Sequence, residues 1–542
     1  MLCPAPSGWN CFYSTFPDGY EQVSHPTGVV ALRVKPAAGA NRRCESGDPV
    51  STNVLCLAQA SLPNRAEHAH DWKSDYRQWL PLLLLAWASA LLLRDRFISD
   101  WDAFDYTAYA VRNVPTSLGL GRALFLGYNH ALWELMHHWF GMPAEQSHLI
   151  LTYGAIVQSG PAVVGLYALY KELTASRLAA TCGALLVALS PLYLIYSGRG
   201  MSEIPGALAF SWSLWWMMRS LRLGYLCQYL GAAALFGLSA NIREFAVFYL
   251  PVVALAARVY GVRWRLCLTA FAVAALAAVA GIIFWSLYGS SDYLSSVIGW
   301  YQLSARERQV HPVTMRNLWL LPAYAFICSP AATLAAPFAL RRLWSERPRR
   351  ALLLMGCFGL LSDLVLLANH DVSVNPRYLL TGLLGLAGVC GWHLAKQYPG
   401  CKLVLAGTVA LTAIGLIGTG VYNYRQISRA IAARDYIAKI ADLPANSVFI
   451  VGKHSPLVNF YRGVGARPRW HTISSGSGWP DDRLGAVIDG YLAEGRPMYV
   501  DFDPQLWEPG MRARNREAPG LEMIQREYRL ESVRASLYRI WK

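Results

Sequence analysis

The sequence predicts a mainly α-helical, polytopic membrane protein with a small α/β domain outside the bilayer at its C-terminal end. Of the 542 residues, 54% are hydrophobic and only 15% are charged, and the mean hydropathy is positive. That balance is unusual for a water-soluble chain of this length. The hydrophobic residues are gathered into runs between about residues 79 and 421, and a helix needs roughly 20 such residues to cross a bilayer. Beyond these runs the chain becomes polar.

The runs divide the chain into an N-terminal tail and a transmembrane domain. Residues 1–75 hold scattered Gly, Pro, Ser and Asn, four cysteines and no sustained period, so we expect a disordered tail. The run at 79–93 is short for a span and is expected to act as a signal anchor. Further spans are predicted at 148–170, 178–196, 204–218, 226–241, 244–258, 267–288, 317–340, 351–369, 377–394 and 403–422. The prediction is a bundle of about eleven transmembrane helices within residues 76–423.

Two other segments are predicted to fold outside the hydrocarbon core. Residues 118–140 are rich in Leu, Trp, Phe and His at helical spacing, which favours a helix lying at the membrane interface. Residues 424–542 contain predicted strands at 447–451, 498–502 and 528–540 and a predicted helix at 481–493, which together make a small α/β domain. The chain has no CxxC or Cys/His ligand spacing, so its eleven cysteines predict neither a metal site nor a disulfide framework.

The basic residues give the predicted orientation. The formal net charge is +15, a value that is also found in nucleic-acid-binding proteins. The arginines and lysines, however, fall in every second connection between spans: Arg219, Arg222, Arg258, Arg263, Arg265, Arg341, Arg342, Arg347, Arg349, Arg350, Lys396 and Lys402. This is the positive-inside pattern. It predicts a cytoplasmic N-terminus, a periplasmic C-terminal domain and no nucleic-acid partner.

Three aspartates stand directly after the first run, at the predicted external face. They are Asp100, Asp102 and Asp105. If the segment is helical, Asp102 and Asp105 lie on one face, where mutual repulsion raises one pKa. Such a pair suits a general base or a divalent-metal ligand. The plainer interpretation is that these acids are solvated and cap a helix N-terminus, and the residues alone do not decide between the two.

Charged residues also stand at the mouths of the other external loops. Arg199 and Glu203 lie in the second loop, Arg243 and Glu244 in the third, and Arg377 at the start of a late span. Arginines at the mouth of a helix bundle are suited to binding a phosphate group. Each of them is equally explained by contact with lipid headgroups.

These motifs, taken in order, resemble the GT-C superfamily of membrane glycosyltransferases. The resemblance rests on Asp100-Trp-Asp-Ala-Phe-Asp-Tyr after the first run, Ser202-Glu-Ile-Pro, Arg243, and Asn375-Pro-Arg-Tyr-Leu-Leu. Within that superfamily the chain looks most like the bacterial branch of protein O-mannosyltransferases and lipid A aminoarabinose transferases. The resemblance covers about residues 95–425.

The resemblance implies an inverting glycosyltransferase of the bacterial inner membrane. Its donor would be a polyprenyl-phosphate sugar, and its acceptor a lipid, a glycan or a protein. Asp102 would be the leading catalytic residue and Asp105 the second, while Arg243 and Arg377 would bind the donor phosphate. Asp100, Arg199 and Glu203 would support the site. A divalent metal, if one is used, would be held by Asp102 and Asp105. The commonest relatives have a Glu where this chain has Ala103, which leaves the choice between the two aspartates open.

Two competing interpretations remain. A transporter or flippase of lipid-linked sugar would place ionisable groups near the middle of the membrane and often shows internal repeats; here Asp363 is the only such acid and we find no repeat. The sequence Asp501-Phe-Asp503 matches the Asp-x-Asp motif of soluble nucleotide-sugar transferases, but the C-terminal domain is too small for that fold. The aromatic residues of the loop at 289–316 either cover the site or form an interfacial belt.

Overall fold

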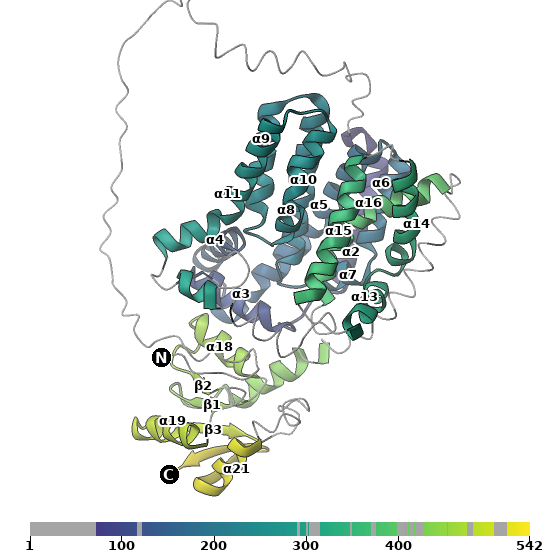
Figure 1. The fold of residues 1–542 in the computed structure, drawn as a ribbon. Helices are drawn as coiled ribbons and strands as arrows, with labels where there is room; N and C mark the ends of the chain where they lie inside the picture. Colours follow the sequence, from purple (N-terminus) through teal and green to yellow (C-terminus); the bar gives the residue numbers. More distant parts are fainter. Residues whose placement is uncertain are drawn as a thin grey trace, which may run out of the picture.

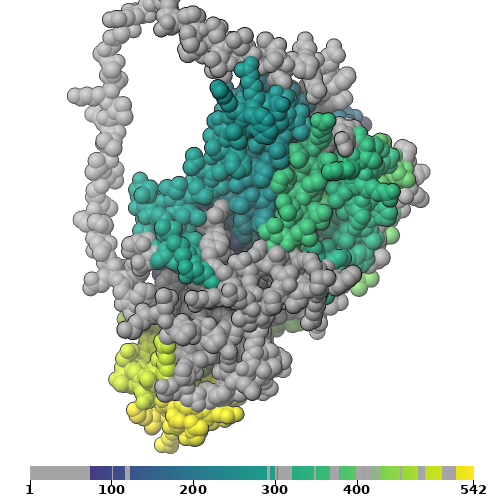
Figure 2. Space-filling view, in the orientation of Figure 1, coloured from purple at the N-terminus to yellow at the C-terminus, as the bar shows by residue number. Residues whose placement is uncertain are grey.

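Long helices form one bundle, and the C-terminal domain lies against one end of it (Figure 1). The computed structural model describes residues 72–115, 122–289, 293–299, 315–346, 350–369, 376–397, 430–451, 454–473, 481–502 and 518–542, with a few isolated positions between 302 and 428. Figure 2 shows the C-terminal domain, in yellow and yellow-green, as a separate lobe at the end of the helical body.

The bundle helices follow the predicted hydrophobic runs closely. They are α2 (Tyr76–Leu92), α5 (His148–Thr174), α6 (Arg177–Ala188), α7 (Pro191–Ser197), α8 (Glu203–Leu223), α9 (Leu226–Ser239), α10 (Phe245–Val259), α11 (Trp264–Tyr288), α13 (Met315–Cys328), α14 (Pro330–Glu346), α15 (Arg350–Asn369) and α16 (Leu379–Gln397). The predicted span at 403–422 lies outside the described residues, isolated positions excepted.

Among the described helices, three are long and apolar enough to cross a membrane: Ala144–Thr174, Trp264–Tyr288 and Leu379–Gln397. The number rises to five when two bent helix pairs each count as one span. The chain is therefore a helical membrane protein, and the figure of about eleven spans stays a prediction.

Two of the predicted spans are broken rather than continuous. The axis bends by 64° between α6 and α7, and by 117° at the break between Cys328 and Pro330. Each second helix begins with a proline, Pro191 or Pro330, which has no N–H to donate to the preceding turn. At the first break, Ser190 caps α7 by accepting a hydrogen bond from the backbone N–H of Tyr193 at 3.1 Å. The breaks therefore have a local chemical cause that the hydrophobic pattern does not reveal.

Small residues let the bundle helices approach closely. A Cβ added at Gly237 of α9 would come within 2.0 Å of the Ala274 carbonyl oxygen of α11, and one at Gly391 of α16 within 2.5 Å of the Ala179 carbonyl oxygen of α6. No side chain fits at either contact. Close packing of this kind is how helices associate inside a bilayer, where lipid provides no hydrophobic driving force.

Two more helices lie at the end of the bundle that faces the C-terminal domain. They are α3 (Trp101–Arg112) and α4 (Ala123–Phe140). Helix α4 corresponds to the described part of the predicted interface helix, and it leaves Trp139 and Phe140 exposed. Asp100 is the N-cap of α3, and its side chain accepts a hydrogen bond from the backbone N–H of Asp102 at 3.1 Å. The capping interpretation of these acids therefore holds for Asp100.

The C-terminal domain contains a five-stranded mixed sheet in the order β2-β1-β3-β5-β4. Strands β1 (Val448–Ile450), β2 (His471–Ile473) and β3 (Met498–Asp501) are parallel, and β4 (Arg529–Arg534) and β5 (Leu537–Trp541) form an antiparallel hairpin beside β3. The domain helices are α18 (Ser455–Gly463), α19 (Asp481–Ala493) and α21 (Ala518–Glu527). The small α/β fold is confirmed, although the predicted strand at 528–540 is in fact two strands joined by a turn.

Asp501 has a structural role within this domain. Its buried carboxylate pairs with Lys439 Nζ at 2.6 Å and accepts a hydrogen bond from Ser536 Oγ, also at 2.6 Å. These contacts tie β3 to the helix that leads into the domain. Asp503, the other half of the Asp-x-Asp sequence, lies outside the described residues.

The C-terminal domain contacts the bundle through α18, which packs on α3 (Figure 1). The rings of Phe104 and Phe460 are 5.5 Å apart. A Cβ added at Gly463 would come within 2.8 Å of the Ala108 Cβ. Since α3 also carries Asp102, the C-terminal domain contacts the helix that holds the predicted catalytic residue.

Candidate functional site

The predicted site residues converge at one end of the bundle, where several helices begin. Asp100 and Asp102 come from the start of α3, Glu203 from the start of α8, Arg243 from just before α10, and Arg377 from a short 3-10 turn before α16. We call these five residues, together with Arg122 and Glu244 described below, the arginine–carboxylate cluster. The sequence separates its members by up to 277 positions.

Arg377 is the centre of the cluster. Its Nη2 lies 2.5 Å from Asp102 Oδ2, its Nη1 lies 3.7 Å from Asp100 Oδ1, and its Nε lies 3.7 Å from Glu203 Oε1. The side chain of Arg377 is only 5% exposed. One guanidinium therefore contacts three carboxylates, two of them from the same helix turn.

Glu203 and Arg243 form a pair that is fully enclosed by protein. Arg243 Nη2 lies 3.0 Å from Glu203 Oε1, and both side chains are 0% exposed. Arg243 Nη1 also donates a hydrogen bond to Ser202 Oγ at 3.2 Å. A Cβ at Gly206 would come within 2.4 Å of the Arg243 Cβ, so the glycine in the first turn of α8 makes room for this arginine. Glu203 and Arg243 therefore hold the N-terminal ends of α8 and α10 together.

Arg122 is a member of the cluster that the sequence analysis missed. It lies at the N-cap of α4 with a positive φ of 48°, and its Nη2 is 3.4 Å from both carboxylate oxygens of Glu244. Its guanidinium lies over the Tyr106 ring, 4.8 Å from the ring centre. The Nε and Nη1 atoms of Arg122 are buried and have no hydrogen-bond partner among the described residues. Its only signal in the sequence is its place within residues 118–140, the segment predicted to form an interface helix.

The pKa values of the two aspartates at the start of α3 are shifted in opposite directions. Both residues lie outside the membrane-spanning helices. Burial, opposed by the charge of Arg377, raises the pKa of Asp100 above its usual value. Burial acts on Asp102 too, but the charges of Arg377 and Arg122 outweigh it and lower the pKa of Asp102. Neighbouring carboxylates with pKa values moved apart are a common arrangement in acid–base sites. Asp102 is held ionised, and Asp100 takes up a proton more readily.

Two predicted residues lie beside the cluster. Arg199 Nε is 3.7 Å from Asp95 Oδ1, and burial raises the pKa of that aspartate despite the arginine. Asp105 is buried one helical turn after Asp102, where burial and then the Asp105 charge raise the pKa of the Tyr109 hydroxyl. Of the three aspartates in this segment, Asp100 and Asp102 form ion pairs with Arg377. The choice between Asp102 and Asp105 as the catalytic residue stays a prediction.

The predicted metal ligands are Asp102 and Asp105. Among the residues that the structure describes, no three His, Cys, Asp or Glu side chains group closely enough to hold a metal ion. Asp102, one of the two predicted ligands, is directly bound by Arg377. A divalent metal held by Asp102 and Asp105 therefore stays a prediction.

Comparison with solved structures identifies the fold. ArnT from Cupriavidus metallidurans in the apo state matches with a TM-score of 0.53 at 13% identity, over 86% of this chain and 98% of ArnT. The same protein bound to undecaprenyl phosphate matches with a TM-score of 0.51 at 11% identity, over 85% and 97%. An oligosaccharyltransferase from Archaeoglobus fulgidus, in complex with Zn and sulfate, is similar over 84% of this chain and 72% of its own, at 12% identity and a TM-score of only 0.45. No protein-family model matches the chain, and no curated protein matches its sequence.

The chain therefore has the fold of the GT-C membrane glycosyltransferases, as the sequence motifs predicted. Within that class, the fold is similar to that of ArnT over nearly the whole length of ArnT. At 11 to 13% identity this likeness concerns the fold alone.

Proposed function

We propose that this protein is a membrane-embedded glycosyltransferase that moves a sugar from a polyprenyl-phosphate donor to an acceptor at the periplasmic end of the bundle. One observation carries the proposal: a buried cluster of arginines and carboxylates lies where several bundle helices begin, which the predicted orientation puts at the membrane boundary. Ionisable groups are costly to hold at such a place and are usually functional. Arginines can stabilise the negative charge of a phosphate leaving group, and carboxylates can accept the proton of a nucleophilic hydroxyl.

The arginines support a lipid-phosphate donor. Arg243 and Arg377 are the residues expected from the resemblance, and Arg122 adds a third guanidinium whose buried Nε and Nη1 have no hydrogen-bond partner among the described residues. Paired N–H groups of this kind bind phosphate oxygens with defined geometry. ArnT has been solved with undecaprenyl phosphate, which agrees with a polyprenyl-phosphate ligand for this fold.

The reaction would be a single displacement. The acceptor hydroxyl oxygen forms a bond to the anomeric carbon, and the bond from that carbon to the donor phosphate oxygen breaks. The hydroxyl proton passes to a carboxylate of the α3 turn, and the electron pair of the broken bond stays on the phosphate, whose added charge the arginines stabilise. Attack from the face opposite the leaving group inverts the anomeric centre, which is the stereochemistry we propose.

Asp102 is proposed as the residue that orients and deprotonates the acceptor. It is ionised and held in place by Arg377 at 2.5 Å, so it is ready to accept a hydrogen bond. A low pKa makes it a weak base by itself, but donor binding draws Arg377 toward the phosphate and returns basicity to the carboxylate. Asp100, which takes up a proton more readily, is proposed to receive that proton in turn. Asp105 remains the second catalytic candidate, and Glu203, whose Oε1 lies near both guanidiniums, is proposed to bridge Arg243 and Arg377 at a fixed spacing.

The proposed orientation uses the placement of the basic connections. Helices α8 and α10 both start at the cluster, so their last turns, which carry Arg222 and Arg258, lie at the opposite end of the bundle from the C-terminal domain (Figure 1). Under the positive-inside rule that opposite end is cytoplasmic. The cluster and the C-terminal domain would then face the periplasm of a bacterial inner membrane.

The test is transfer of radiolabelled sugar from native polyprenyl-phosphate lipids, in membranes that contain the chain. Asp102→Asn is expected to lower transfer by about two to four orders of magnitude, the range contributed by one acid–base group. Asp105→Asn measures the competing assignment in the same membranes. Asp489→Asn is the matched control, because that carboxylate is 42% exposed on the C-terminal domain. Full transfer by Asp102→Asn at normal protein levels would contradict the assignment of Asp102, and absence of transfer by the wild type with every lipid fraction would contradict the function.

Transport of lipid-linked sugar is the second candidate. One observation favours it: α13 and α14 form a broken helix pair beside Asp363, the kind of arrangement found at transporter binding sites. Movement of labelled lipid-linked sugar across vesicles, without a glycosylated product, would select this alternative.

A further inference from the structure

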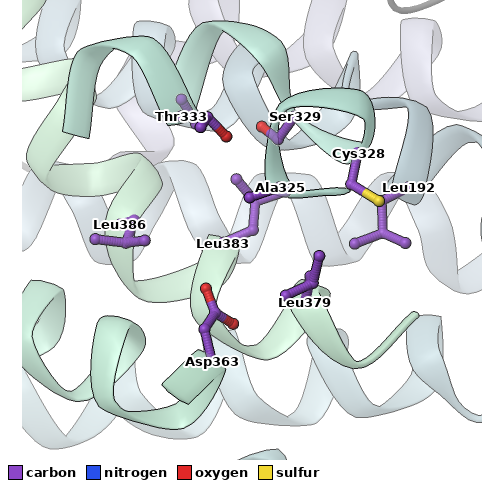
Figure 3. A pocket seen from close by; sticks show the side chains of 10 residues that line it. Leu192, Ala325, Cys328, Ser329, Thr333, Asp363, Leu379, Leu383 and Leu386 are labelled. Atoms are coloured by element: carbon purple, nitrogen blue, oxygen red, sulfur yellow. The ribbon is translucent and has the colours of Figure 1, made fainter. Parts of the chain in front are cut away.

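The connection between α2 and α3 leads directly into the arginine–carboxylate cluster. It covers residues 93–100 and ends at Asp100, the N-cap of α3. Near its start is Asp95, whose side chain is only 12% exposed. Two other buried acids of the bundle lie elsewhere: Asp75 precedes α2, and Asp363 lies on α15 beside leucine side chains of α16 (Figure 3). Of these three acids, Asp95 is the one that adjoins the cluster.

The side chain of Asp95 joins two parts of the chain. Its Oδ2 accepts a hydrogen bond from Ser99 Oγ, four residues further along the same connection. Its Oδ1 lies 3.7 Å from Nε of Arg199, in the connection between α7 and α8. The side chain of Arg199 is 1% exposed, so this pair lies largely away from water, where opposite charges attract more strongly. The carboxylate therefore links the connection before α3 to the connection before α8.

The backbones of the same two connections also lie against each other. The backbone N–H of Asp95 donates a hydrogen bond to the Gly198 carbonyl oxygen at 2.9 Å. A Cβ added at Gly198 would come within 2.7 Å of the Arg94 Cα and within 2.8 Å of the Ala90 carbonyl oxygen. No side chain fits there, because both atoms belong to the backbone. The two connections are therefore held together at the point where Asp95 meets Arg199.

Both side-chain partners of Asp95 lead on to Asp100. Ser99 is buried and directly precedes Asp100 in the chain. Burial raises the pKa of Asp100, and Arg199 is one of two arginines, with Arg377, whose positive charge opposes that rise. Asp100 in turn caps α3 and pairs with Arg377. A change at Asp95 therefore reaches the start of α3 both along the chain, through Ser99, and through space, through Arg199.

We propose that Asp95 is a positioning residue, which fixes the start of α3 and with it the Asp102 carboxylate. It acts through its contacts with Ser99 and Arg199 and not by contact with the reacting atoms. The inference rests on the proposed glycosyltransferase function. A displacement of about 1 Å at a catalytic group can lower a rate about a hundredfold, so a loosened α3 slows transfer even when every catalytic side chain is present.

The experiment makes two measurements on Asp95→Asn in the full chain. In membranes, kcat for sugar transfer should fall about a hundredfold. KM for the donor should stay close to the wild-type value, because Arg243 and Arg377 come from other helix starts. In purified protein, backbone amides at the start of α3 should exchange hydrogen about tenfold faster or more, the effect of losing one hydrogen bond to a charged group.

Ser99→Ala tests the path through the chain. It removes the hydroxyl that donates to Asp95 and keeps both charges of the pair with Arg199. This variant should lower kcat in the same direction. The double variant with Asp95→Asn should be no slower than Asp95→Asn alone, because both changes break the same link and their effects are not additive.

Asp75→Asn is the matched control for loss of stability. It makes the same chemical change at a buried carboxylate at the other end of α2, where Asp75 pairs with Lys171 and Arg177. This variant should lower the unfolding temperature and leave kcat unchanged. An equal fall in kcat for Asp75→Asn would overturn the proposal, because loss of stability alone would then explain the effect.

The proposal is also overturned if Asp95→Asn keeps the wild-type kcat or the wild-type exchange at the start of α3. Either result, in membranes where the wild type transfers sugar, would leave the proposed function standing and remove the role of Asp95. Wild-type membranes that transfer no sugar with any lipid fraction would instead contradict the proposed function, and the role of Asp95 would fall with it.

Discussion

Replacing Glu244 by Gln should destabilise the protein in a strongly pH-dependent way. Burial disfavours the charged form of Glu244, but Arg243 and Arg122 outweigh it and lower the pKa of Glu244 from 4.5 to about 2. Because a difference of one pKa unit corresponds to about 1.4 kcal/mol, the carboxylate is worth about 3 kcal/mol of folding free energy at neutral pH. The side chain is 23% exposed, so solvent screens this energy only in part.

The sign of the pH effect follows from the lowered pKa. The stabilisation by the Glu244 carboxylate is fully present above the unfolded-state value of 4.5 and is lost as the pH falls toward 2. Gln has no charge to lose. The gap between the unfolding midpoints of wild type and Glu244→Gln should therefore be widest at neutral pH and should narrow steadily as the solution is acidified below 5 or so.

The assay is thermal unfolding of the full chain in detergent across this pH range. Glu494→Gln serves as the control, because Glu494 is exposed in a turn of the C-terminal domain and a surface change of this kind costs at most about 0.5 kcal/mol. A gap for Glu244→Gln that is equally wide in acid and at neutral pH would refute the reasoning, since it would show that Glu244 acts through packing and not through its charge.

Substitutions at three further residues test the cluster and its contact with the C-terminal domain. Arg377→Gln should lower sugar transfer strongly and move the acid limb of the pH–rate profile upward, because Arg377 lowers the pKa of Asp102; Arg377→Lys should restore only part of the rate, since ammonium lacks the planar fork. Arg122→Gln should weaken donor binding by about tenfold or more, the effect of losing a charge-assisted hydrogen bond to phosphate, and should appear in KM for the donor. Phe460→Ala should destabilise the contact between α18 and α3 by about 3 kcal/mol or more, visible as faster proteolytic release of the C-terminal domain.

The sequence predicted the parts of the fold that depend on local pattern. A run of apolar residues forms a helix wherever a bilayer must satisfy its backbone, so α5, α11 and α16 lie where the hydropathy placed them. The breaks escaped prediction. Hydropathy averages over a window, whereas the 117° bend at Ser329 depends on a single missing N–H at Pro330.

The candidate site also has features that the sequence predicted and features that only the structure shows. The sequence alone predicted that Asp102, Arg243 and Arg377 lie on the same side of the membrane, because loop charge and span parity place all three in external loops. Only the tertiary structure decided that Arg377 binds Asp102, a partner 275 residues away in the chain, and that Arg122 joins them. Sidedness is a property of each segment, but pairing depends on which helix starts lie next to each other, and that is decided by the packing of the whole bundle.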